Sequence, residues 1–279
     1  MTVARQLRAV ACLELAEVRR SRWILFCLAV YGILGAGLVL VGLRESTLLG
    51  FTGIGRVLLG FAQALVLVLP LLALTAVGQV VGRARDDGTL ELLFGHPIGR
   101  GAYIAGVTLV RYLALLAPLA VMVVGLGVYG QLVLGDQVAW PFVWRTLAVG
   151  AALLWAFTGV GLAISVLVRS PARAVIAVIL AWGLGVALLD FGLIAVMLRW
   201  RIDAHAVFTL AALNPVEDAR LALLAGLDPD LATLGPVGFY LATRLGPALL
   251  FVLGVVWPLA VGAGAWALAF RSFRRDDPI

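Results

Sequence analysis

The side chains that could carry covalent, acid–base or metal chemistry are few in this sequence and stand far apart. The two cysteines are Cys12 and Cys27, the two histidines are His96 and His205, and the three methionines are scattered. Metal sites need such ligands in clusters, and nucleophiles need an activating partner. Because the sequence has neither an HExxH nor a GxSxG with partner residues, we expect no metal site and no enzyme activity. A membrane enzyme and a passive sensor or scaffold are the least favoured classes of function.

The absence of lysine excludes further kinds of binding site and catalysis. All 21 basic residues of the chain are arginine. A P-loop nucleotide site requires a lysine on the nucleotide phosphates, and Schiff-base catalysis requires a lysine amine. We therefore expect this chain to bind no cofactor of its own. Any ATP and magnesium that drive it must be bound by a separate ATPase subunit.

Two ionisable residues stand inside long apolar runs. Arg111 lies about ten residues into one run, and Asp190 about sixteen residues into another. A charge in hydrocarbon is costly unless it faces protein or water. The interpretation favoured here is a structural pair of Arg111 with Asp190 or an arginine that extends to the interface, and a substrate contact is the alternative.

The most polar interruption of the first two-thirds of the chain is the stretch 86–101, DDGTLELLFGHPIGRG. Its leucines predict a short amphipathic helix that Gly88 precedes and that Gly95 and Pro97 end. Flanking arginines place the loop 83–101 on the cytoplasmic side, where a soluble partner could reach it. The alternative is an ordinary solvated loop whose arginines only fix the topology.

Composition identifies the elements that must position these residues. The chain of 279 residues is 63% apolar and 13% charged, whereas soluble domains carry about a quarter charged residues. This indicates an integral membrane protein. The net charge of +6 comes from arginines at the ends of apolar runs, so it indicates orientation and contact with membrane lipid, and no nucleic-acid partner is expected.

The apolar runs predict an all-α, polytopic membrane protein, with residues 1–279 as a single transmembrane domain. Residues 1–22 form an amphipathic helix at the interface, with Glu14 interrupting its apolar side. Six runs near the roughly 20 residues that cross a bilayer follow. These predicted spans are 23–43, 57–81, 102–134, 141–168, 174–198 and 247–270.

Arginine distribution sets the predicted orientation. Thirteen of the 21 arginines fall in segments that an even number of spans would keep on one side, and this side is cytoplasmic by the positive-inside rule. Both termini are then cytoplasmic, and we expect a multi-pass protein of the bacterial inner membrane. The thirteen are Arg5, Arg8, Arg19, Arg20, Arg22, Arg83, Arg85, Arg100, Arg169, Arg173, Arg271, Arg274 and Arg275.

The extracytoplasmic segment 199–246 predicts a second short helix, between spans five and six. Asn214 can cap a helix whose first position is Pro215, and Glu217 completes a capping-box arrangement. Gly226 supplies a stop. We expect this capped helix to lie outside the membrane span.

Several of these motifs resemble a known family. GTLELL followed by Pro97-Ile98 and Arg100 resembles the first cytoplasmic loop of type-2 ABC-transporter permeases, and within them the NosY-like branch that serves nitrous oxide reductase maturation. Three further segments extend the resemblance over most of the chain. They are GFTGIG (50–55), LLDFGLIAVML (188–198) and LNPVEDARLALLAG (213–226).

The resemblance implies that the cytoplasmic loop carries a coupling helix held in a groove of a separate, NosF-like cytoplasmic ATPase. It also implies that two permease copies stand side by side. The residues it assigns to ATPase coupling are Asp86, Asp87, Gly88, Thr89, Leu90, Glu91, Leu92, Leu93, Pro97 and Arg100.

On the outer side the resemblance implies docking of a periplasmic, NosD-like β-helix protein. The residues for this docking are Asn214, Pro215, Glu217, Asp218 and Arg220; the alternative is a helix that only seals the outer mouth. The implied function is ATP-driven work on a sulfur species or a periplasmic partner, for assembly of the copper-sulfide site of nitrous oxide reductase. The alternative is an exporter of lipid, antibiotic or another amphiphile.

Overall fold

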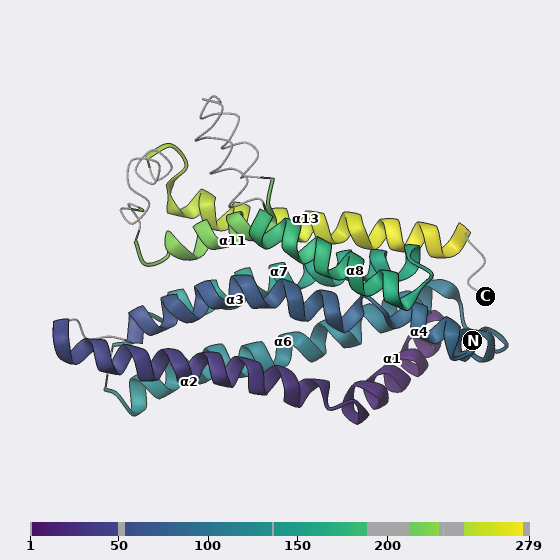
Figure 1. Cartoon of the computed structure of the whole chain (residues 1–279), viewed down its shortest axis with the longest axis horizontal. Coiled ribbons are helices and arrows are strands. Elements are labelled where there is room, and N and C mark those ends of the chain that lie inside the picture. Colours follow the sequence, from purple (N-terminus) through teal and green to yellow (C-terminus); the bar gives the residue numbers. More distant parts are fainter. Residues whose placement is uncertain are drawn as a thin grey trace.

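Every element in the described part of the chain is a helix (Figure 1). The computed structural model describes residues 2–49, 54–135, 137–188, 213–228, 231 and 243–275. The elements are α1 (Val3–Arg20), α2 (Trp23–Leu49), α3 (Ile54–Val77), α4 (Val80–Asp86), α5 (Thr89–Phe94), α6 (Arg100–Leu132), α7 (Trp140–Leu167), α8 (Pro171–Trp182), a π-helical segment (Gly183–Leu188), α11 (Pro215–Leu224) and α13 (Gly246–Arg275).

Four of the described helices are long and apolar enough to cross a membrane. They cover Val57–Asp86, Arg100–Leu132, Trp140–Leu167 and Gly246–Arg275, and the first of them includes both α3 and α4. The all-α prediction is confirmed, and the protein is a multi-pass membrane protein. The predicted span 23–43 falls within α2, and the predicted span 174–198 begins in α8 but has residues 189–198 outside the described part of the chain.

Helix α7 is the centre of the bundle, packing against α13, α3, α6 and α11. Its closest approach to α13 is at a pair of glycines. A Cβ atom on Gly159 would stand 2.6 Å from the carbonyl oxygen of Gly262, and a Cβ on Gly262 would stand 2.8 Å from the carbonyl oxygen of Trp155. Small residues let apolar helices approach backbone to backbone, where dispersion contacts are densest.

Helix α1 packs along α6 and meets α2 at a sharp bend, where Arg22 has a φ of 55°. The face that α1 buries carries Val10, Glu14 and Val18. Val10 lies so close to Gly106 of α6 that a Cβ on this glycine would approach the valine side chain to 2.7 Å. Helix α1 is therefore docked on the bundle along its length.

Helix α11 packs beside α13, and its predicted place outside the membrane span stays a prediction. Ala222 and the backbone of Asp218 contact Gly254, and the indole nitrogen of Trp257 donates to the carbonyl oxygen of Leu213 at 2.9 Å. These α13 residues stand roughly 12 to 17 Å along the helix from its start at Gly246. The small surface of Gly254 allows this approach. Five of the ten residues of α11 are buried, so this helix is part of the bundle.

Candidate functional site

Helix α5 is a single short helix that two glycines delimit. Gly88 has a φ of 68°, in the left-handed region that glycine adopts without strain, and so it turns the chain sharply between α4 and α5. Leu90 points into the bundle and is 1% exposed, whereas Leu92 is 74% exposed and Glu91 is also exposed. One face of α5 therefore anchors the helix and the other is free to contact a partner.

Aromatic rings fix α5 to the ends of two spans. The ring of Phe94 lies 6.0 Å from that of Tyr103 on α6 and 6.1 Å from that of Phe273 on α13, and the last two stack at 5.8 Å. Arg100 adds a hydrogen bond from its guanidinium to the carbonyl oxygen of Arg274 at 3.0 Å. These ring contacts join α5 to both α6 and α13.

Gln6 ties the same loop to α1. Its side-chain amide donates to the carbonyl oxygen of Pro97 at 2.7 Å and accepts from the backbone N–H of Gly99 at 3.3 Å. These bonds satisfy two backbone groups just before α6 begins. Gln6 was not among the predicted site residues, because a polar residue on an exposed helix face carries no distinguishing signal.

The helical segment 54–86 is broken between α3 and α4. The predicted span 57–81 is not one continuous helix, since α3 ends at Val77 and α4 begins at Val80. Side chains from neighbouring helices satisfy the interrupted backbone. The Ser165 hydroxyl accepts from the N–H of Val81 at 2.9 Å, and Arg111 donates to the carbonyl oxygen of Ala76 at 2.9 Å. The break separates span α3 from the α4–α5 segment.

Arg111 also forms an ion-pair network with α1. Its guanidinium lies 3.1 Å from the carboxylate of Glu14 and 3.0 Å from that of Glu17. Glu14 is buried, at 3% exposed, while Glu17 is largely exposed. Arg111 therefore pairs with two glutamates of α1 that the sequence analysis did not assign to it, and the predicted pair with Asp190 stays a prediction because Asp190 lies outside the described residues. The sequence signal for the ion pair with α1 was Glu14, which interrupts the apolar side of α1.

The predicted outer docking residues divide between the interior and the surface. The Asn214 side chain accepts from the N–H of Val216 at 3.0 Å, which confirms the predicted helix cap, and donates to the carbonyl oxygen of Gly185 at 2.9 Å. Asn214 and Asp218 are buried. Pro215, Glu217 and Arg220 are partly exposed, and the last two form an ion pair at 2.9 Å. Only these three can touch a docked protein without rearrangement of α11.

Comparison with known proteins gives the family. The family model described as ABC-2 family transporter protein matches residues 8–277. The chain belongs to the ABC-2 transporter family. It is 25% identical over 272 residues to the probable ABC transporter permease protein NosY of Stutzerimonas stutzeri, covering 95% of this chain and 97% of the relative. It is 27% identical over 287 residues to the probable NosY of Pseudomonas aeruginosa, with the same coverage of both chains.

The ABC-2 membership confirms the resemblance read from the cytoplasmic loop and the segment 213–226. The protein is an ABC-2 type permease subunit with NosY homologues, and its family implies an ATPase partner and a non-catalytic membrane subunit. The coupling residues predicted from the loop come together around α5. Leu90 and Phe94 lie on its inner face, Leu93 is partly buried, and Glu91 and Leu92 are exposed.

Replacement of Arg111 by methionine in this permease is expected to loosen α1 from the bundle. Burial raises the pKa of Glu14, which the positive charge of Arg111 partly offsets. Without the arginine, Glu14 binds a proton more readily, which limits the loss to about 2 kcal/mol of stability. Because a carboxyl with a raised pKa contributes most to folding in its protonated state, the loss should shrink as the pH falls.

Limited proteolysis of α1, followed across pH in detergent, measures this effect. The variant Arg111→Met with Glu14→Gln is the matched control, since it removes the charge left behind, and it should be more resistant to cleavage than Arg111→Met alone at neutral pH. Equal cleavage of the single and double variants at every pH would show that the Glu14 pair does not hold α1.

Proposed function

We propose that this permease receives force at α5 from a separate cytoplasmic ATPase. The observation that carries the proposal is the two-faced geometry of α5, with Leu92 exposed while Leu90 and Phe94 are anchored in the bundle. A surface that is free on one side and rigidly joined to two spans on the other is what a mechanical contact requires. An ordinary solvated loop, which is the alternative, would not require the contacts of the Phe94 ring with α6 and α13.

The proposed orientation places α4, α5 and both termini in the cytoplasm. The start of α1 and the end of α13 lie at the same end of the molecule as α4 (Figure 1). An even number of spans joins them, and we propose six, formed by α2, α3, α6, α7, the segment that begins with α8, and α13. The arginines at this end, among them Arg83, Arg274 and Arg275, support the cytoplasmic assignment in a bacterial inner membrane.

The proposed mechanism uses two permease copies, each with its α5 on one of two NosF-like ATPase subunits. ATP and magnesium bind in these partners. Nucleotide binding can shift the permease between two arrangements only if the ATPase contacts α5 differently in each arrangement. The aromatic contacts of Phe94 would then deliver the difference to α6 and α13.

We propose that the work serves copper-sulfide site assembly of nitrous oxide reductase, through a sulfur species or a periplasmic NosD-like β-helix protein. The support is the similarity to two probable NosY proteins over 95% of the chain. The scattered cysteine, histidine and methionine residues favour copper being held by other proteins. The second candidate is an exporter of lipid, antibiotic or another amphiphile, which the ABC-2 family match also supports.

Affinity purification of the tagged permease in mild detergent, with identification of its companions, tests the proposal. We expect recovery of an ABC ATPase and of a periplasmic β-helix protein. The double variant Glu217→Ala and Arg220→Ala, which changes the exposed part of α11, should weaken recovery of the periplasmic protein and leave the ATPase bound. Recovery of an ATPase alone from the unmodified permease would favour the amphiphile exporter, and recovery of neither would contradict both candidates.

A further inference from the structure

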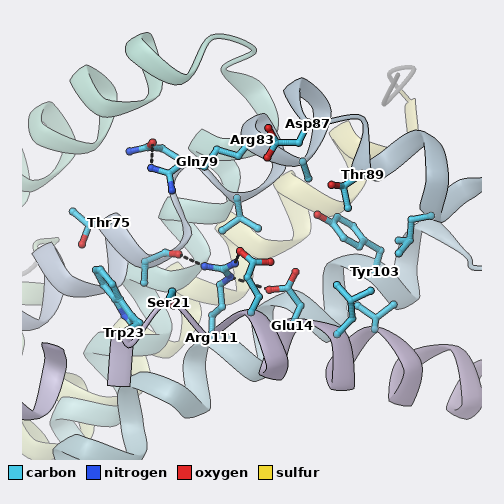
Figure 2. Close-up of a pocket in the computed structure, with 17 residues that line it drawn as sticks. Glu14, Ser21, Trp23, Thr75, Gln79, Arg83, Asp87, Thr89, Tyr103 and Arg111 are labelled. Atoms are coloured by element: carbon cyan, nitrogen blue, oxygen red, sulfur yellow. Dashed lines mark hydrogen bonds and ion pairs between the residues drawn. The ribbon is translucent and has the colours of Figure 1, made fainter. Parts of the chain in front are cut away.

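A cavity of about 530 Å³ lies beside the break between α3 and α4. Its volume is in the range of about 300 to 1,000 Å³ that small-molecule sites occupy. Helix α1 forms one wall, and the ends of α3, α4, α5 and α6 form the others. Figure 2 shows Arg83 and Asp87 on one side of this space and Arg111 with Glu14 on the opposite side.

The charges around the cavity do not cancel. Arg111 is matched by Glu14 and Glu17, and this leaves one negative charge in excess on the α1 side. Within the described part of the chain, no ion pair involves the carboxylate of Asp87. Arg83 donates to the side-chain oxygen of Gln79 at 2.8 Å and keeps further N–H groups for another acceptor. The cavity thus presents carboxylates for a cation and one arginine for an anion.

A ligand that matches this pattern carries a primary ammonium close to a phosphate. An ammonium donates three hydrogen bonds, for which the carboxylates that line the cavity on either side are acceptors, and the guanidinium of Arg83 suits a phosphate. The residues that line the cavity indicate that such a ligand comes from the membrane. Leu13 of the amphipathic α1 and the indole ring of Trp23 line the cavity, and these residue types favour the membrane interface.

We propose that this cavity binds the phosphoethanolamine headgroup of a phospholipid from the adjoining leaflet, between Arg83 of α4 with Asp87 directly after this helix and Glu17 of α1. A headgroup held there bridges α1 and α4 across the break between α3 and α4. The proposal rests on the protein being a membrane protein and is independent of the cargo and of the ATPase.

Lipid binding to the delipidated permease, measured by native mass spectrometry during titration, tests the proposal. Phosphatidylethanolamine is expected to bind about tenfold more tightly than phosphatidylcholine or phosphatidylglycerol. The choline headgroup has methyl groups in place of N–H donors, and the glycerol headgroup lacks the cation. Equal binding of the three lipids would overturn the proposal. Equally tight binding of water-soluble glycerophosphoethanolamine would overturn a membrane lipid as the source of the ligand.

The variants Asp87→Asn and Arg83→Gln each remove one recognition group from an exposed position, directly after α4 and within it respectively. Each is expected to lower phosphatidylethanolamine binding about tenfold, and binding of phosphatidylglycerol should change little in Asp87→Asn. Glu91→Gln is the matched control, because it removes a nearby exposed carboxylate that does not line the cavity. Wild-type binding in both α4 variants, with each variant monodisperse on gel filtration, would contradict the proposed site.

Discussion

Replacement of Leu92 by aspartate is expected to abolish co-purification of the ATPase while the permease still inserts and folds. The side chain is 74% exposed on the outer face of α5, so the permease itself loses no packing. A partner groove that buries this leucine would instead have to bury a charge. A buried apolar contact at the centre of an interface contributes about 2 kcal/mol or more, which corresponds to roughly 30-fold in affinity.

Replacing Leu92 alone gives a result that is easier to interpret than replacing Leu92 and Leu93 together. Leu93 is partly buried and lines the cavity beside α1, so its replacement would confuse loss of the partner with damage to the permease. Leu213→Asp is the matched control, since Leu213 is also an exposed leucine but lies beside Trp257 on the α11 side of the molecule. Full ATPase recovery by Leu92→Asp would show that α5 does not carry the contact.

Replacement of Gly262 by leucine should leave little folded protein. A Cβ at this position would stand 2.5 Å from the Trp155 ring and 2.8 Å from the Trp155 carbonyl oxygen. The carbonyl belongs to the backbone of α7 and cannot turn away, so α13 would have to separate from the central helix of the bundle. Overpacking of this kind costs about 3 kcal/mol or more when the backbone cannot yield.

Gly264→Leu provides the control for this prediction. It lies in the same helix two residues further on, and a Cβ there would meet nothing within 4 Å. Both variants add the same side chain and remove the same flexibility, so they differ only in the contact with α7. Thermal unfolding in detergent, followed by gel filtration, compares them. Equal stability of the two variants would mean that the α7–α13 contact does not hold the bundle together.

The elements that depend on local sequence could be predicted, whereas the contacts that depend on distant residues could not. The all-helical class follows from the length of the apolar runs. The cap at Asn214 and the turn at Gly88 follow from residues whose side chain, or lack of one, favours that backbone. Arg111, in contrast, pairs with Glu14, which is 97 positions away, and no pattern along the chain connects the two.

The break between α3 and α4 and the placement of α11 escaped prediction for the same reason. The residues around Gly78 are mostly apolar, with Thr75 and Gln79 among them, so hydropathy favours one straight helix. The break is stable because Ser165 and Arg111 satisfy its backbone groups from other helices. Likewise, α11 can lie beside α13 because Gly254 makes room for Ala222, and this fit appears only when both helices are in place.

The side-chain hydrogen bonds at the break between α3 and α4 are those expected of a hinge. A backbone bond inside a helix can be lost only by unwinding a turn, but the side chains of Ser165 and Arg111 can release Val81 and Ala76 while every helix keeps its shape. After this break, the Phe94 ring of α5 contacts Tyr103 of α6 and Phe273 of α13. If a partner displaces α5, we therefore expect α5, α6 and α13 to move together about this break, and α3 to move less.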